Sequence, residues 1–293
     1  MNFKIFFAGI AVMICGKIVG QESAYGNFDK EKMLNSKFST VGAYLWCDFG
    51  QLRNEAFFDF AKKNGVSEIY LSQREIDYKD FDFFEKTKYF LEMAHKRNLK
   101  VFRLLGSQKR TIEDFKSDIT DICKKIQQTI DYNKQVPDSI KFAGIHLDVE
   151  FDSIKDDTKY QIFSDCAVQL CEQYGNQIQM DFSIVKYNST VMYKGQPTAV
   201  YKVIINEAER TFIQSYKNNA DSIFEYVKPF IEYAGTTAKK GTIVYTIRPK
   251  QFTKGYLYMN DQLKRLYDMT EYKNTGLAIH TLNNWFSKAD YEE

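Results

Sequence analysis

The hydrophobic positions of this chain fall into short runs separated by longer stretches of helical periodicity. Short apolar runs bounded by Gly or Asn are typical of buried β-strands. The pattern predicts strands at residues 41–46, 68–72, 100–105, 142–149, 179–185, 211–216, 242–247 and 276–282.

Apolar stripes with the helical period fill the gaps between these strands. They lie within residues 56–61, 83–94, 115–130, 163–174, 223–231 and 263–267, and Thr111 is the expected N-cap of the third helix. Strands that alternate with helices imply a parallel sheet with crossover connections. The count of eight favours one closed (β/α)8 barrel, a TIM barrel, over an open doubly wound sheet. We place it at residues 38–293, with a polar lead-in at 21–37.

The first residues have the pattern of a secretory signal peptide. Lys4 precedes an apolar run at residues 5–15, and small or polar residues follow. The run is too short to cross a bilayer, so we place a cleaved signal at residues 1–20, while Lys17 leaves an uncleaved anchor open. We therefore expect a secreted protein with no membrane contact after signal removal. Four cysteines remain beyond the signal, and their spacing identifies no disulfide pair or metal motif.

The net charge and the absence of phosphate-binding motifs exclude several classes of binding partner. The net charge is +2 and no block of Lys or Arg recurs on a predicted face, so a nucleic-acid or anionic-membrane partner has no support. The chain lacks GxGxxG and GxxxxGK[ST], the usual phosphate-binding loops. Aromatic residues make up 16% of the chain, which suits either a large core or stacking platforms for a sugar.

The predicted strand at 142–149 and the residue after it carry the clearest chemical signal. Three ionisable side chains share one face, because successive side chains of a strand point to opposite sides. They are His146, Asp148 and Glu150. Charged groups are rarely buried unless they are paired or take part in chemistry. The alternatives are an edge strand with one wet face and an internal charge network.

In such a barrel the active site lies at the carboxyl ends of the strands. Polar and aromatic side chains close several other predicted strands, and we expect them, together with His146, to bind substrate. They are Trp46, Asp181, Gln214, Tyr216, Arg248, His280 and Trp285.

The two carboxylates suggest acid catalysis. Glu150 lies about 6.6 Å beyond Asp148 along the strand, so each raises the cost of ionising the other. The more enclosed carboxyl can stay protonated near neutral pH. Cleavage of a glycosidic bond needs such an acid to protonate the leaving oxygen. These residues predict a glycoside hydrolase that acts on an oligo- or polysaccharide and needs no cofactor or metal.

Residues 142–150, FAGIHLDVE, resemble the strand-four signature of family 18 glycoside hydrolases, the chitinases and their relatives. That signature reads hydrophobic-Asp-Gly-hydrophobic-Asp-hydrophobic-Asp-x-Glu. Gly144, Asp148 and Glu150 match it, whereas Ala143 and His146 replace its first two Asp residues. The fit is closer to a looser group of family-18-like barrels with His-Leu-Asp-x-Glu on strand four and Ala-Ile-His on strand eight, here residues 278–280.

The resemblance implies a role for each matching residue. Glu150 would be the general acid, and Asp148 would orient a substrate N-acetyl group whose oxygen is the nucleophile. Tyr216 would assist from strand six, and Trp285 would form the floor of a sugar subsite. An N-acetylated saccharide is therefore the implied substrate.

Two other functions remain open. The altered signature also suits a non-catalytic, lectin-like barrel that binds sugar through its aromatic residues. A metal-dependent hydrolase could use His146, His280 and the carboxylates, but the chain lacks the His-x-His and HExxH spacings that mark many such sites.

Overall fold

A computed structural model describes residues 38–47, 55–73, 82–108, 111–185 and 189–290. The predicted signal peptide and the polar lead-in lie outside these ranges. None of the helices within them is long and apolar enough to cross a membrane.

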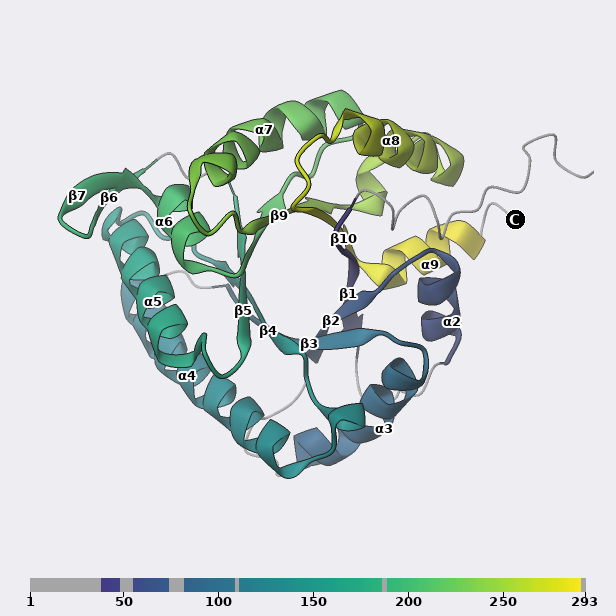
Figure 1. The fold of residues 1–293 in the computed structure, drawn as a ribbon, viewed down its shortest axis with the longest axis horizontal. Coiled ribbons are helices and arrows are strands. Elements are labelled where there is room, and N and C mark those ends of the chain that lie inside the picture. The colour runs from purple at the N-terminus through teal and green to yellow at the C-terminus, as the bar shows by residue number, and fades with distance from the viewer. Residues whose placement is uncertain (1–37, 48–54, 74–81, 109–110, 186–188, 291–293) are drawn as a thin grey trace, which may run out of the picture.

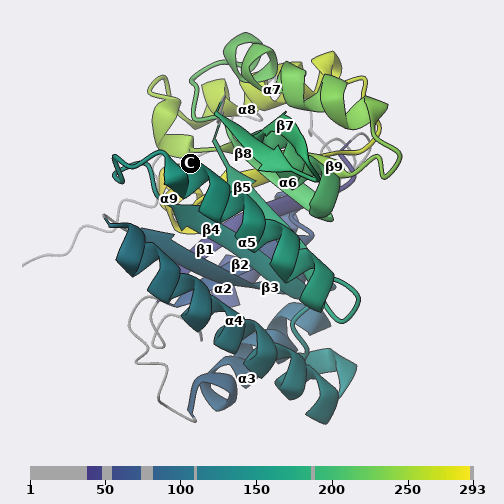
Figure 2. The same ribbon diagram turned by 90° about the vertical axis from the view of Figure 1, so that its left-hand side faces the viewer.

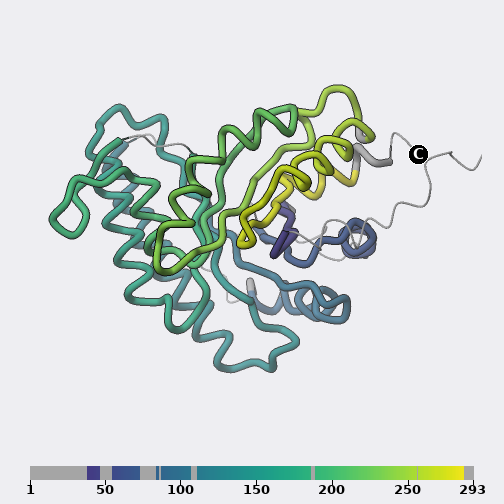
Figure 3. Tube along the Cα trace, turned by 45° about the horizontal axis from the view of Figure 1, so that its top comes forward, coloured from purple at the N-terminus to yellow at the C-terminus, as the bar shows by residue number. Residues whose placement is uncertain are grey.

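The fold is a closed barrel of eight parallel strands, as the sequence predicts (Figure 1). Around the barrel the strands follow the order β1-β10-β9-β8-β5-β4-β3-β2. Their bounds are β1 Val41–Cys47, β2 Glu68–Gln73, β3 Lys100–Gln108, β4 Gly144–Glu150, β5 Gln179–Ile184, β8 Arg210–Gln214, β9 Thr242–Ile247 and β10 Thr275–His280. The first strand pairs with the last, and this pairing closes the barrel (Figure 3).

Eight helices of the described residues surround the strands, one after each barrel strand. They are α2 Glu55–Lys63, α3 Asp82–Lys96, α4 Ile112–Gln135, α5 Thr158–Tyr174, α6 Val200–Glu207, α7 Ala220–Thr236, α8 Tyr256–Met269 and α9 Leu282–Asp290. Thr111 is the N-cap of α4 as predicted, since its hydroxyl accepts a hydrogen bond from the Asp114 amide at 3.1 Å. Figure 2 shows α4 and α5 side by side along the barrel wall.

Two features of the wall had no predicted counterpart as secondary structure. A hairpin of β6, Thr190–Tyr193, and β7, Gln196–Ala199, lies between β5 and α6 and projects at the left of Figure 1. The short helices α6 and α9 were also not predicted. Each has nine residues or fewer, which is little more than two helical turns, so its apolar stripe is short.

The barrel interior is packed rather than hollow. One buried cluster fills it, made of Tyr44, Tyr70, Phe102, Leu104, Phe212, Val244 and Ala278. Gly144 faces this cluster, and a Cβ there would lie 2.6 Å from a ring carbon of Phe102 and 2.9 Å from the Gln179 carbonyl oxygen. The glycine of the β4 motif is thus required by close packing.

A buried ion network forms the floor of the barrel. Arg210, the first residue of β8, donates from its Nη1 to Glu68 at 2.5 Å and from its Nη2 to Asp181 at 2.5 Å. The Tyr70 hydroxyl and the Gln179 amide add hydrogen bonds to the two carboxylates. Glu68 is the first residue of β2, so this network lies at the amino ends of the strands.

The cysteines whose side chains the structure describes do not form disulfides. Cys123, Cys166 and Cys171 are free thiols on α4 and α5. Burial raises the pKa of Cys166 and of Cys171 to about 12, so both are protonated at neutral pH.

Candidate active site

The carboxyl end of β4 brings two carboxylates to the barrel mouth. Asp148 pairs in register with Gly106 of β3, and Glu150 with Gln108. Asp148 is 6% exposed, whereas Glu150, the last residue of the strand, is half-buried. The alternation read from the sequence therefore holds, with Asp148 deeper and Glu150 nearer the opening.

Asp148 is held by polar neighbours and has an elevated pKa. The Gln214 amide donates to its Oδ1 at 2.7 Å and to the Ser183 hydroxyl at 3.1 Å. Burial and then the charge of Glu150 raise the pKa of Asp148 to about 6, although hydrogen bonds with Ser183 and Gln214 oppose the shift. The more enclosed carboxyl is Asp148, and its pKa lies above the ordinary value but below neutral pH, so it is mostly ionised at pH 7 and mostly protonated only below about pH 6.

Tyr216 and Arg248 lie next to each other beyond the ends of β8 and β9. Because Gln214 pairs with Thr246, these two residues, each two positions further on, reach the same level of the mouth. The Arg248 guanidinium carbon lies 3.7 Å from the centroid of the Tyr216 ring. The Tyr216 hydroxyl and the Arg248 Nε are buried and have no hydrogen-bond partner among the described residues. Burial and the charge of Asp148 raise the pKa of Tyr216, so its hydroxyl is a neutral donor.

Rings line the mouth beside β1 and β10. His280 ends β10, and its ring lies 5.7 Å from the ring of Tyr216, 6.0 Å from Trp46 and 4.9 Å from Tyr44. Trp46 is half-buried and reaches toward β3, where a Cβ on Gly106 would be 3.8 Å from its Cη2. Aromatic rings at this level can stack on a sugar face.

Seven of the ten predicted site residues therefore lie around the mouth: the two carboxylates and five others. The structure brings together the following set: Asp148, Glu150, Trp46, Gln214, Tyr216, Arg248 and His280. Tyr44, which was not predicted, lies below these rings in the buried interior cluster and is 0% exposed, so it supports His280 from inside the barrel. Its signal is its position two residues before Trp46 on β1.

His146 lies inside the barrel and not at the mouth, which corrects the prediction that it binds substrate. It is 0% exposed, packs against Phe212 with ring centroids 4.3 Å apart, and shares a 2.9 Å hydrogen bond with the Tyr44 hydroxyl. Burial and the charge of Arg210 lower the pKa of His146 well below its usual value, so it is neutral. It faces the same side as Asp148 but lies one layer deeper.

Asp181 is also corrected. It is 0% exposed and belongs to the ion network with Arg210 at the barrel floor. Its carboxylate is occupied by that arginine and by Gln179, so it cannot reach a ligand at the mouth.

Trp285 is not a floor for a sugar subsite, although the resemblance implied that role. It lies on α9, outside the barrel, and is 1% exposed. Its ring packs edge-on against Phe60 of α2 with centroids 5.3 Å apart. The inward-facing aromatic side chain at the end of the last strand is His280 instead.

The described residues offer little support for the metal-dependent alternative. They contain no group of three or more His, Cys, Asp or Glu side chains arranged to hold a metal ion. Of the two histidines in that hypothesis, His146 is enclosed in the aromatic interior.

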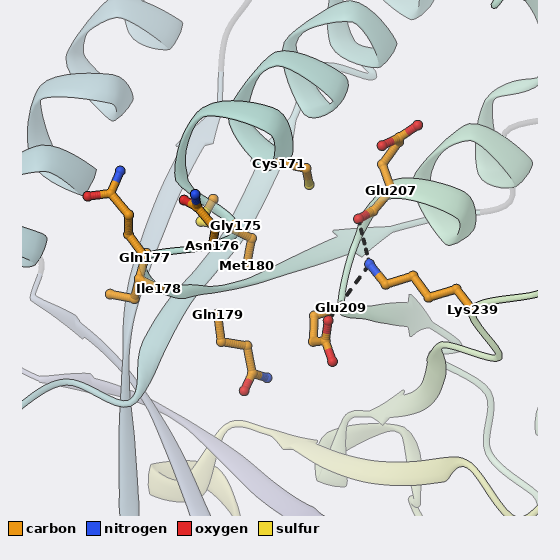
Figure 4. Close-up of a pocket in the computed structure, with 10 residues that line it drawn as sticks. All are labelled: Cys171, Gly175, Asn176, Gln177, Ile178, Gln179, Met180, Glu207, Glu209 and Lys239. Carbon is orange, nitrogen blue, oxygen red and sulfur yellow. Dashed lines mark hydrogen bonds and ion pairs between the residues drawn. The ribbon is translucent and has the colours of Figure 1, made fainter.

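A separate polar pocket of about 490 Å³ lies at the other end of the strands (Figure 4). Gln179, the first residue of β5, and Glu209, just before β8, contribute to it. The Lys239 amino group donates to the Glu207 carbonyl oxygen at 2.8 Å and lies 3.7 Å from the Glu209 carboxylate. The Glu207 carboxylate pairs with Lys194, just outside the lining, so the charges of this pocket have partners, and we assign no chemistry to it.

The fold has counterparts among solved structures. Over 87% of this chain and 100% of the other, it is similar to a GH18 chitinase from Pseudoalteromonas aurantia, with a TM-score of 0.57 and 10% sequence identity. The chain has the fold of a family 18 chitinase. It is also similar to CpGH84B, with a TM-score of 0.52 and 9% identity over 87% of this chain and 48% of that one. Comparison with protein-family models and with curated proteins gives no match.

Proposed function

We propose that this protein is an exported glycoside hydrolase in which Glu150 is the general acid and Asp148 its buried partner. The observation that carries the proposal is the pair of carboxylates on β4 at the mouth, with Asp148 at a pKa of about 6. Nearby rings and the similarity of the fold to a chitinase support a saccharide as the substrate.

The geometry suggests a division of labour between the two carboxyls. Glu150 lies nearer the opening, where it can give its proton to the leaving glycosidic oxygen. Asp148 keeps its own proton up to about pH 6 and is fixed by the amide of Gln214. It can donate a hydrogen bond to Glu150 or to a substrate acyl oxygen. The Tyr216 hydroxyl, which is neutral and has no hydrogen-bond partner among the described residues, can donate a second hydrogen bond.

The substrate class follows from the family resemblance of β4. In that pattern the residue at Asp148 orients an N-acetyl group, so an N-acetylated glycan is our first candidate substrate. Export from the cell would expose the barrel to such glycans, and the proposed signal at residues 1–20 supplies the route.

Sugar binding without cleavage is the second candidate, and one observation favours it. His146 replaces an Asp of the family signature and is buried and neutral. In the family pattern a second carboxylate lies one layer below the residue at Asp148 and interacts with it. Here an uncharged imidazole takes that place. A barrel of this kind can retain its aromatic platforms while losing turnover.

The test compares wild type with Glu150→Gln on fluorogenic glycosides and polysaccharides, including N-acetylhexosamine substrates. We expect wild type to cleave at least one N-acetylated substrate and the variant to lose on the order of 10²–10⁴-fold in rate, because general-acid catalysis is worth about that much. Glu225→Gln, on the exposed face of α7, is the matched control and should keep full activity.

Thermal unfolding of each variant shows whether folding is intact. Full activity in Glu150→Gln would refute its assignment as the acid. Binding of a saccharide by calorimetry, without product after prolonged incubation of wild type, would establish the sugar-binding function instead.

A further inference from the structure

Arg248 is a cation at the mouth that forms no ion pair with a described carboxylate, although its charge lowers the pKa of Asp148. The described residues offer no carboxylate within ion-pair distance, and its Nε is buried without a hydrogen bond. Its contact is the face of Tyr216, at 3.7 Å. A cation on an aromatic face is stabilised by the ring quadrupole, yet its planar fork of N–H donors remains available to a ligand.

The other described arginines are used differently. Arg97 binds Glu55 and Asp59, and Arg265 binds Asp221. Arg103 donates to the Lys125 carbonyl and the Thr129 hydroxyl, and Arg210 binds Glu68 and Asp181. Four of the five described arginines therefore have oxygen acceptors, and the exception is the one at the mouth.

The loops around Arg248 carry further positive charge. Residues 215–219, after β8, and residues 248–255, after β9, contain no Asp or Glu. They hold Arg248 and three lysines, Lys217, Lys250 and Lys254, all three exposed. By contrast, the loop after β4, residues 151–157, holds three exposed aspartates and one lysine. Among the described loops, the mouth thus has a basic side at β8 and β9 and an acidic side at β4.

We propose that the mouth selects glycans with an anionic oxygen substituent, a carboxylate or a sulfate, and that Arg248 binds this group beside Tyr216. This inference rests on the proposed function only in that the mouth binds a saccharide. A guanidinium makes two parallel hydrogen bonds to a carboxylate or sulfate, which a neutral sugar hydroxyl cannot match. The three exposed lysines attract such a glycan through the longer-range electrostatic field. The ring of Tyr216 supports the guanidinium in the orientation that binding requires.

The experiment measures binding to matched pairs of oligosaccharides by calorimetry in the Glu150→Gln background, which prevents cleavage. One pair is an N-acetylglucosamine–glucuronic acid oligomer and the same oligomer with its carboxylates reduced to alcohols. The other pair is a chitin oligomer and its 6-O-sulfated form. We expect at least one charged member to bind about tenfold or more tightly than its neutral partner, because a charged hydrogen-bonded pair is worth that much. The two pairs distinguish carboxylate from sulfate.

Substitution of Arg248 should remove this preference. Added to that background, Arg248→Gln should bring the charged and neutral members to within about twofold, with little change for the neutral one, and Arg248→Lys should keep part of the preference. The control is Arg265→Gln, which removes the same charge from the outer face of α8 and should keep the full preference. The preference should also weaken as ionic strength rises.

Three outcomes would overturn the inference. They are equal binding of both members of each pair, no binding of any of the four oligosaccharides, and a preference that survives Arg248→Gln. Failure of the proposed hydrolase activity is a separate result, because it appears as absence of cleavage by wild type while the binding preference remains. Conversely, cleavage of neutral substrates without any preference for charge would leave the hydrolase intact and remove this inference.

Discussion

Two arginines of the same barrel differ in their partners. Arg210, at the floor, is 5% exposed and binds Glu68 and Asp181 at 2.5 Å each. Arg248, at the mouth, has an aromatic ring for a neighbour and a buried Nε without a partner. They lie on adjacent strands or just beyond them, so the difference reflects depth in the barrel and not the local sequence.

The contrast separates a floor that stabilises the barrel from a mouth that is available to bind a ligand. The charged groups of the floor network satisfy one another, which suits a role in holding the barrel together. Polar groups at the carboxyl ends are left with unused donors, as Tyr216 and Arg248 are. Proteins depart from full polar satisfaction mainly where a ligand completes the set. The two ends can be tested separately through stability and binding.

The largest effect on stability should come from breaking the floor. In Arg210→Met, two carboxylates remain buried at 3% and 0% exposure without their cation. Removal of one partner from a buried ion network costs about 3–5 kcal/mol of folding free energy. Chemical denaturation followed by circular dichroism measures this loss.

A variant that also removes the two carboxylates shows whether their unpaired charge causes the loss of stability. Combining Arg210→Met with Glu68→Gln and Asp181→Asn removes the stranded carboxylates, so most of the lost stability should return. A loss below about 1 kcal/mol in Arg210→Met would mean that the floor does not depend on this ion network.

The next largest effect on stability is expected at Asp148, where a substitution should stabilise the fold. Asp148 has a pKa near 6 in the folded protein, against an ordinary value of 3.8, so folding opposes its ionisation. As pH rises from about 4 to about 6, the unfolded chain releases this proton while the folded protein keeps it, and stability falls. Above that range the penalty is constant. Asp148→Asn should therefore be more stable than wild type by about 2–3 kcal/mol at neutral pH.

The difference between the two proteins should grow through the same pH window and vanish below it. Denaturation of both at several pH values measures it, and other carboxylates cancel in the subtraction. A variant that is less stable than wild type at neutral pH would mean that the Gln214 hydrogen bond outweighs the burial of the charge. If Asp148 supports turnover in its protonated form, the activity of wild type should decline as pH rises above about 6.

The sequence was sufficient for the eight strands and for the two carboxylates, because both depend on local patterns. A strand has a period of two, so alternation on β4 shows that His146 and Asp148 point inward. It does not show how deep each one lies. Depth depends on the stagger between strands far apart in the chain, as when His146 pairs with Asp181 and that residue with Arg210. His146 and Asp181 were therefore expected at the mouth, but both lie below it.

Trp285 was misplaced for a different reason. It follows β10 closely, and a loop position would have put it at the mouth. Instead α9 begins at Leu282, and the helix turns Trp285 toward Phe60 on the outer wall. The segment is too short to show a clear helical period. Arg248 was predicted to contact substrate, but the absence of an ion pair with any described carboxylate could be seen only once the neighbouring strands were placed.

The smallest effect on stability should come from Arg248 itself, and it completes the comparison with Arg210. Arg248→Gln removes a cation that no carboxylate of the described residues binds, and with it a ring contact worth about 0.5–1 kcal/mol. The relief of a partly buried charge offsets some of this loss, so the change in unfolding free energy should stay within about 1 kcal/mol. Chemical denaturation of Arg248→Gln and Arg210→Met under the same conditions compares the stability that each arginine contributes. A loss as large as that of Arg210→Met would assign Arg248 to the framework of the barrel, whereas a small one leaves its unused donors to a ligand.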